Sequence, residues 1–157
     1  MRYPEAMALQ PGDKAPGFEI LTDEGKTLRL SDLAGRKIVL YFYPKADTPG
    51  CTTEACEFRD ASAAYKKKKA VVIGVSPDKV SAQARFKAKF ELDFPLLADE
   101  DHKICEAYGV WKEKSMYGRK YMGVERTTFV IDEKGRIAHV FEKVKPAGHA
   151  AQVLAVL

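Results

Sequence analysis

The sequence predicts an α/β protein with a mixed central sheet. Two apolar runs rich in β-branched and aromatic residues, 37–43 and 70–76, are typical of strands buried on both faces, which are usually parallel. A helical pattern separates these runs, and strands joined by a helix pair in parallel. Two later strand-like segments, 127–132 and 136–141, flank a Glu-Lys-Gly turn and predict an antiparallel hairpin.

The composition fits one globular domain that spans residues 1–157. A chain of this length buries roughly 68–70% of the surface that its unfolded form exposes, so it needs no disulfide or metal to hold a core. No apolar run approaches the ~20 residues of a membrane-spanning helix. Residues 1–16 contain no apolar stretch of the length that a secretory signal requires, about 7–15 residues. We therefore expect a cytoplasmic protein with no membrane partner.

The net charge of +4 is concentrated in one basic run, Lys66–Lys69. Such a run can bind nucleic acid or an anionic surface. However, no aromatic residues interleave with these lysines, as single-strand binders require. Cations at the end of a helix also complement the negative end of its dipole. We expect a solvated helix end and no nucleic-acid partner.

The N-terminal part is expected to form a hairpin followed by one helical turn. Residues 18–30 predict the hairpin, with its turn at Asp23–Gly25, where the glycine supplies a positive φ. Ser31 and Asp32 can cap a short helical turn that Gly35 closes.

The helix after strand 37–43 has a well-marked start. Thr48 is expected at the N-cap and Pro49 at the first helical position, which places Cys51 in the first turn. Residues three or four apart form one inward face that continues toward the basic run. These residues are Cys51, Ala55, Phe58, Ser62 and Tyr65.

The second half of the chain alternates helices and short strands. Helices are expected near 78–91 and 100–108, on either side of a strand at 94–97. Residues 112–123 are expected to form a mobile loop, and a last helix is expected after Pro146. Together with a cysteine at the start of the first long helix, this order indicates a thioredoxin-like fold. In this fold, helices cover both faces of the mixed sheet, here with an N-terminal hairpin.

The three cysteines, Cys51, Cys56 and Cys105, are an odd number, which does not suit a secreted disulfide framework. In the first turn of a helix, a thiol faces free backbone N–H groups and the positive dipole end, and both favour the nucleophilic thiolate. Five residues along an α-helix separate two Cα atoms by about 8.6 Å, whereas a disulfide requires about 4.4–6.8 Å. Cys51 and Cys56 therefore cannot bond while the helix is intact. This arrangement suits a catalytic pair better than a structural bridge.

The segment Pro44–Cys51 matches the P-x-x-x-T-x-x-C signature of peroxiredoxins, directly after a buried strand. With Thr52–Cys56, the chain resembles the subfamily called peroxiredoxin Q or bacterioferritin comigratory protein, and the likeness extends to 101–111 and 121–137. The resemblance implies a thiol-dependent peroxidase that reduces hydrogen peroxide and organic hydroperoxides without cofactor or metal. It also implies a thioredoxin-type reductant as partner and a monomeric state.

The resemblance further implies a role for each matched residue. Cys51 would be the peroxidatic cysteine, which attacks the peroxide O–O bond and becomes a sulfenic acid. Cys56 would be the resolving cysteine, which forms an intramolecular disulfide that the reductant then opens. Thr48 would orient the peroxide, and Pro44 would shield the pocket from water. Arg126 would stabilise the thiolate and polarise the peroxide.

Other classes stay open at this point. Cys51, Cys56, His102 and Cys105 are ligand types for zinc, although ligands roughly 140° apart on one helix do not converge easily. A disulfide oxidoreductase would share the fold, but it normally uses C-x-x-C. A basic binding module would depend on Lys66–Lys69.

Several further residues have a structural interpretation. Cys105 is expected to pack in the core, and Trp111 is expected to pack against other side chains rather than to form a substrate platform. Glu54 either bonds to Arg126 or is a solvated acid at the helix start. The three histidines show no partner pattern; they are His102, His139 and His149.

Overall fold

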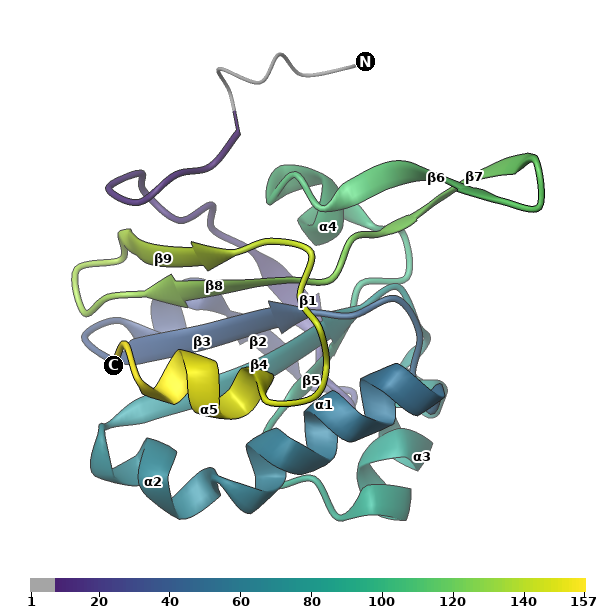
Figure 1. Ribbon diagram of the computed structural model, residues 1–157. Coiled ribbons are helices and arrows are strands. Elements are labelled where there is room, and N and C mark those ends of the chain that lie inside the picture. The colour runs from purple at the N-terminus through teal and green to yellow at the C-terminus, as the bar shows by residue number, and fades with distance from the viewer. Residues whose placement is uncertain (1–7) are drawn as a thin grey trace.

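The computed structural model describes residues 8–157 and contains a five-stranded mixed sheet (Figure 1). In spatial order its strands are β5 (Leu96–Ala98), β4 (Ala70–Ser76), β3 (Lys37–Phe42), β8 (Thr127–Ile131) and β9 (Ile137–Phe141). β3, β4 and β5 are parallel, whereas β8 is antiparallel to both β3 and β9. The predicted α/β class, the two buried central strands and the closing hairpin are confirmed.

The helices lie where the sequence predicts them, each with shorter bounds. They are α1 (Pro49–Asp60), α2 (Ser62–Lys67), α3 (Val80–Phe90), α4 (Lys103–Ala107) and α5 (His149–Leu154). Among the helices of residues 8–157, none has the length and apolar character to span a membrane.

Helices cover both faces of the sheet, because alternate residues of β3 point into two separate cores. Val39 and Tyr41 pack with α1, α2, α3 and α5 on one face. Ile38, Leu40 and Phe42 pack with α4 and the N-terminal segment on the other. This period of two is the normal geometry of a strand buried on both sides.

The expected N-terminal hairpin is present as β1 (Glu19–Leu21) and β2 (Thr27–Arg29), which pair antiparallel. A single 3₁₀ turn, η2 (Leu30–Leu33), follows it. The carboxylate of Asp32 accepts the backbone N–H of Arg29 at 2.9 Å, which fixes the start of that turn.

The prediction for residues 112–123 was wrong. Instead of a mobile loop, the chain forms an antiparallel ribbon, β6 (Trp111–Met116) and β7 (Arg119–Val124), which projects from the body of the molecule (Figure 1). Most of its side chains are exposed on both faces, so the apolar–polar alternation of a half-buried strand is missing. At the turn, Tyr117 and Gly118 have φ of 52° and 77°. Two-residue hairpin turns use this geometry, but usually with Asn or Asp in the first position.

The single helix expected from Pro49 is broken at Ala61, which has φ −90° and ψ 6°. Ser62, expected on the inward face, is only half-buried, and its hydroxyl donates to the Asp93 carboxylate at 2.5 Å. Beyond the break, Tyr65 remains buried, and its hydroxyl donates to the carbonyl of Ala150 at 2.6 Å. The break thus allows α2 to join α5 through this bond.

Candidate active site

Cys51 lies in the first turn of α1, just beyond the carboxyl end of β3, and is only 1% exposed. Two contacts fix the loop that leads to it. The backbone N–H of Ala46 donates to the Asp78 carboxylate at 2.7 Å, and Lys89 pairs with Asp47 at 2.9 Å. The sulfur therefore sits in a nearly closed site on a constrained loop and helix start.

Thr48 occupies the N-cap of α1 and Pro49 the first helical position, as predicted. The Thr48 side chain makes no capping hydrogen bond to the helix; its hydroxyl donates to the carbonyl of Lys45 at 2.8 Å. The tight turn at Asp47, which has φ 60°, accounts for this bond, since it brings the Lys45 carbonyl back toward the helix start. Pro44 is half-buried at the end of β3.

Arg126 reaches Cys51 because of the pairing between β3 and β8. Thr127, the first residue of β8, lies opposite Phe42, the last residue of β3, so Arg126 arrives at the edge where α1 begins. Its Nη2 donates to Sγ of Cys51 at 3.3 Å. Its Nη1 donates to Oε1 of Glu54 at 2.7 Å. One planar guanidinium thus joins the sulfur to a carboxylate.

Glu54 lies three residues after Cys51 and is completely buried, so its contact is with Arg126 rather than solvent. Burial raises the pKa of Glu54 to about 7, although Arg126 acts in the opposite direction. Within residues 8–157, its Oε2 has no hydrogen-bond partner. Burial alone would lower the pKa of Arg126, but Glu54 and Cys51 raise it, so the guanidinium keeps its charge.

Gly50 makes room for this contact. A Cβ atom at this position would lie 3.3 Å from Nη2 of Arg126 and 3.3 Å from Cγ of Pro146. The absence of a side chain therefore lets Arg126 and the segment before α5 close over the helix start. Sequence reasoning missed Gly50, because the P-x-x-x-T-x-x-C signature leaves this position unspecified.

All three cysteines are free thiols. Cys56 is half-buried on α1, which is continuous from Pro49 to Asp60. Cys105 is completely buried, as expected, but it belongs to the core on the other face of the sheet from Cys51. Burial raises the pKa of the Cys105 thiol. The sheet separates Cys105 from Cys51, whereas Cys56 shares its helix.

His149 has partners that the sequence did not reveal. Its Nδ1 lies 3.0 Å from Oε1 of Gln152, and its Nε2 lies 2.7 Å from the hydroxyl of Thr128. Because the glutamine oxygen only accepts, Nδ1 carries the proton and Thr128 donates to Nε2. Burial lowers the pKa of His149 and favours this neutral form. His149 thus ties α5 to β8.

The four candidate zinc ligands do not come together in the structure. His102 stacks on Trp111, with ring centroids 4.1 Å apart, while Cys51 and Cys105 lie on opposite faces of the sheet. In the part of the chain that the structure describes, no three His, Cys, Asp or Glu side chains are placed to hold a metal ion.

Comparison with known proteins gives consistent matches. The model of the AhpC/TSA family matches residues 11–140. The chain is 53% identical over 148 residues to a putative peroxiredoxin bcp of Coxiella burnetii, covering 94% of this chain and 98% of the relative. A mutant of PrxQ from Xylella fastidiosa superposes with a TM-score of 0.90 at 38% identity, covering 94% of each chain. The bacterioferritin comigratory protein of Xanthomonas campestris, studied for its alkyl peroxide reduction activity, gives a TM-score of 0.85 at 41% identity over 88% of each chain.

Proposed function

Because the chain belongs to the AhpC/TSA family and is a peroxiredoxin of the Bcp/PrxQ group, a thiol-dependent peroxidase with a thioredoxin-like fold, we propose that Cys51 is its peroxidatic cysteine and Cys56 its resolving cysteine. The observation that carries the assignment of Cys51 is the hydrogen bond from Arg126 to its sulfur, at 3.3 Å. The proposal takes residues 1–157 as a single domain.

In the first step, the Cys51 thiolate attacks one oxygen of the peroxide and the O–O bond breaks. Sulfur gains the oxygen and becomes a sulfenic acid, while the other oxygen leaves with its electron pair and takes a proton to form water or an alcohol. The Arg126 N–H donates to the sulfur and holds a fixed positive charge beside it. The same fixed cation offsets charge as it moves from sulfur to the leaving oxygen.

Thr48 and Pro44 complete the peroxide pocket in this proposal. The hydroxyl proton of Thr48 is directed to the Lys45 carbonyl. Its oxygen therefore keeps lone pairs that can accept a hydrogen bond from the peroxide O–H and orient it toward Cys51. Pro44, half-buried at the entrance to the loop, limits the access of water.

In the second step, the Cys56 thiol attacks the sulfenic sulfur of Cys51, releases water and forms an intramolecular disulfide. The two Cα atoms are about 8.6 Å apart in an ideal helix, so the first turns of α1 must unwind for the bond to form. Cys105 is a poor alternative because it lies across the sheet. A thioredoxin-type dithiol then reduces the disulfide and is itself oxidised.

We place this reaction in the cytoplasm, on a monomer, with hydrogen peroxide and organic hydroperoxides as substrates. The alkyl peroxide reduction studied in the Xanthomonas campestris relative supports the organic substrates. Three free cysteines suit a reducing compartment.

A thiol count after peroxide treatment tests the proposed function. The reduced protein is mixed with one equivalent of hydrogen peroxide or of cumene hydroperoxide, and free thiols are then titrated in denaturant. We expect the wild type to lose two of its three thiols, and Cys51→Ser to lose none at the same time point. Equal thiol loss in the wild type and Cys51→Ser would rule out Cys51 as the peroxidatic residue.

A further inference from the structure

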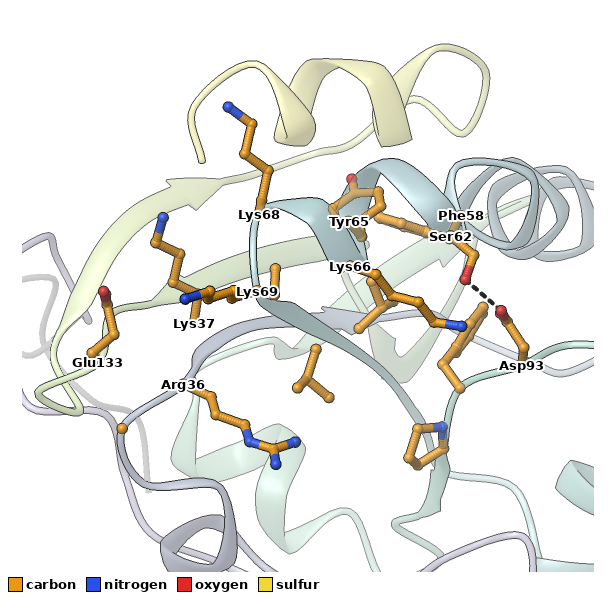
Figure 2. Close-up of a pocket in the computed structure, with 16 residues that line it drawn as sticks. Arg36, Lys37, Phe58, Ser62, Tyr65, Lys66, Lys68, Lys69, Asp93 and Glu133 are labelled. Atoms are coloured by element: carbon orange, nitrogen blue, oxygen red, sulfur yellow. Dashed lines mark hydrogen bonds between the residues drawn. The ribbon is translucent and has the colours of Figure 1, made fainter.

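A cavity of about 620 Å³ lies at the amino ends of β3 and β4 (Figure 2). Lys37, the first residue of β3, lines it, whereas Phe42 at the other end of β3 precedes the Cys51 loop. Six residues of strand extend about 20 Å. The cavity is therefore a separate feature from the proposed peroxide site.

The floor of the cavity is apolar and includes three aromatic side chains, Phe58, Tyr65 and Phe94, which are 1%, 2% and 6% exposed. Its apolar side chains include Phe58, Tyr65, Val72, Phe94 and Pro95. The rings of Phe58 and Tyr65 pack with centroids 5.7 Å apart. Because Phe58 belongs to α1, an occupant would contact the helix that carries Cys51 and Cys56.

The rim of the cavity is strongly cationic. Five cationic side chains line it, from the turn before β3, the first residue of β3, the end of α2 and the loop before β4: Arg36, Lys37, Lys66, Lys68 and Lys69. Figure 2 shows these side chains on several sides of the cavity, with Lys68 and Arg36 extending in opposite directions. The rim includes two carboxylates, Asp93 and Glu133, so five cations against two anions leave a formal charge of +3.

The two rim carboxylates form no ion pairs with these cations in the part of the chain that the structure describes. Within residues 8–157, none of the five forms an ion pair. Asp93 accepts the hydroxyl of Ser62. Like charges held around one concave surface repel each other, and an anion bound between them would relieve that repulsion.

The helix dipole does not explain the whole cluster. It accounts for Lys66 in the last turn of α2. Lys68 and Lys69 lie beyond that helix, and Arg36 and Lys37 come from a different part of the chain. Lys69 also has φ 56°, a left-handed conformation that is uncommon for lysine. The helix-end interpretation therefore explains Lys66 but not the position of the other four cations.

We propose that this cavity binds a multiply charged organic anion with an aromatic body, of the chemistry of a nucleoside diphosphate. Its phosphates would lie among the rim cations, and its base would lie against the aromatic floor. The volume is within the range of small-molecule sites, about 300–1,000 Å³. A polymeric nucleic acid fits less well, because the cations surround a cavity instead of forming an extended stripe with exposed aromatic residues.

Calorimetric titration of the reduced full-length protein tests this site, with ADP, adenosine and pyrophosphate as probes in about 0.1 M salt. We expect ADP to bind saturably. Adenosine lacks the phosphates and pyrophosphate lacks the base, so each should bind at least tenfold more weakly than ADP. Amide NMR shifts on adding ADP should concentrate at 66–72 and 93–95. The triple variant Lys66→Gln, Lys68→Gln, Lys69→Gln should weaken ADP binding at least tenfold.

The matched control has the same net charge but alters exposed lysines away from the cavity: Lys26→Gln, Lys79→Gln and Lys103→Gln. It should bind ADP within twofold of the wild type. Equal loss in both triple variants, or no saturable ADP binding, would overturn the proposal. If a single-stranded oligonucleotide binds more tightly than ADP and shifts the same amide signals, the proposed small anion is wrong and the ligand is a nucleic acid.

Two further measurements keep the result interpretable. Thermal unfolding checks that the cavity variant folds, and Lys68→Gln alone serves if the triple variant does not. Single-turnover peroxide reduction should be unchanged in the cavity variant, because none of its three lysines belongs to the Cys51 site. Loss of ADP binding and loss of peroxidase activity are thus separate outcomes.

Discussion

The guanidinium of Arg126 lies 3.3 Å from the sulfur of Cys51, although 75 residues separate them in the chain. The register between β3 and β8 sets this contact, with Thr127 opposite Phe42. The second arm of the guanidinium bonds to Glu54, which fixes its plane. The environment of the proposed nucleophile therefore depends on sheet pairing as much as on the helix start.

Replacing Arg126 by lysine should slow the reaction with peroxide about 10²-fold. Lysine keeps the charge, but its ammonium lacks the planar fork that donates to Cys51 and Glu54 together. Loss of one aimed donor typically costs about 10²–10³ in rate. Stopped-flow measurement of sulfenic acid formation under single-turnover conditions gives the rate. The control is Arg136→Lys, at an exposed position directly before β9. A rate for Arg126→Lys equal to that of this control would contradict the proposed role.

Glu54 should make the folded state less stable as the pH rises. Burial raises its pKa from 4.5 to about 7, so between these values the folded chain holds more protons than the unfolded chain. This contribution is complete below about pH 4.5 and is lost as the pH rises through about 7. It amounts to up to about 3 kcal/mol, from 1.36 kcal/mol per pKa unit.

Urea unfolding at pH 5 and pH 8 measures this effect. Glu54→Gln cannot titrate, so its free energy of unfolding should vary less between the two pH values than that of the wild type. Glu100→Gln, at an exposed position, should behave as the wild type. An unchanged pH dependence in Glu54→Gln would show that this carboxyl is not perturbed in the folded state.

Gly50→Ala should lower the peroxide rate several-fold without destabilising α1. The new Cβ would crowd Arg126 and Pro146, both at 3.3 Å, and displace the guanidinium by a few tenths of an ångström. Alanine itself favours a helix over glycine by about 1 kcal/mol. Gly17→Ala is a matched control, because nothing lies within 4 Å of a Cβ there. A rate equal to that of Gly17→Ala would show that the close approach does not matter.

The sequence predicts a helix or strand correctly wherever the segment buries one or both of its faces. The runs at 37–43 and 70–76 correspond to β3 and β4 because both faces of these strands are covered. The ribbon β6–β7 has almost no buried face, so its sequence lacks the alternation of apolar and polar residues that predicts a strand. The break at Ala61 depends on contacts with distant segments, which local spacing does not encode.

The site was only partly predictable for a related reason. Cys51 is identifiable from helix-start chemistry, but the placement of Arg126 was expected only from family resemblance. Burial raises the pKa of Glu54, and this burial depends on tertiary packing that the local sequence does not reveal. The cationic cavity was missed because its lysines and arginine come from separate segments that meet only in the fold.

Cys105→Ser should retain the peroxide rate and lose about 1–3 kcal/mol of stability. Its side chain is fully buried, and a hydroxyl there would replace a weakly polar thiol in an apolar core. Urea unfolding and the single-turnover rate measure the two effects. Cys105→Ala separates polarity from volume. Loss of activity in a folded Cys105→Ser protein would transfer the resolving role to this residue.

Disulfide mapping tests the central claim that Cys51 and Cys56 act as a pair on one helix. The reduced protein receives one equivalent of hydrogen peroxide, is digested without reductant, and its linked peptides are identified by mass spectrometry. Cys56→Ser is the control and should stop at the sulfenic acid, which excess peroxide converts to sulfinic acid. We predict a Cys51–Cys56 linkage, with faster amide exchange across 50–58 as the first turns of α1 unwind. A Cys51–Cys105 linkage, or a bond between two chains, would contradict the account.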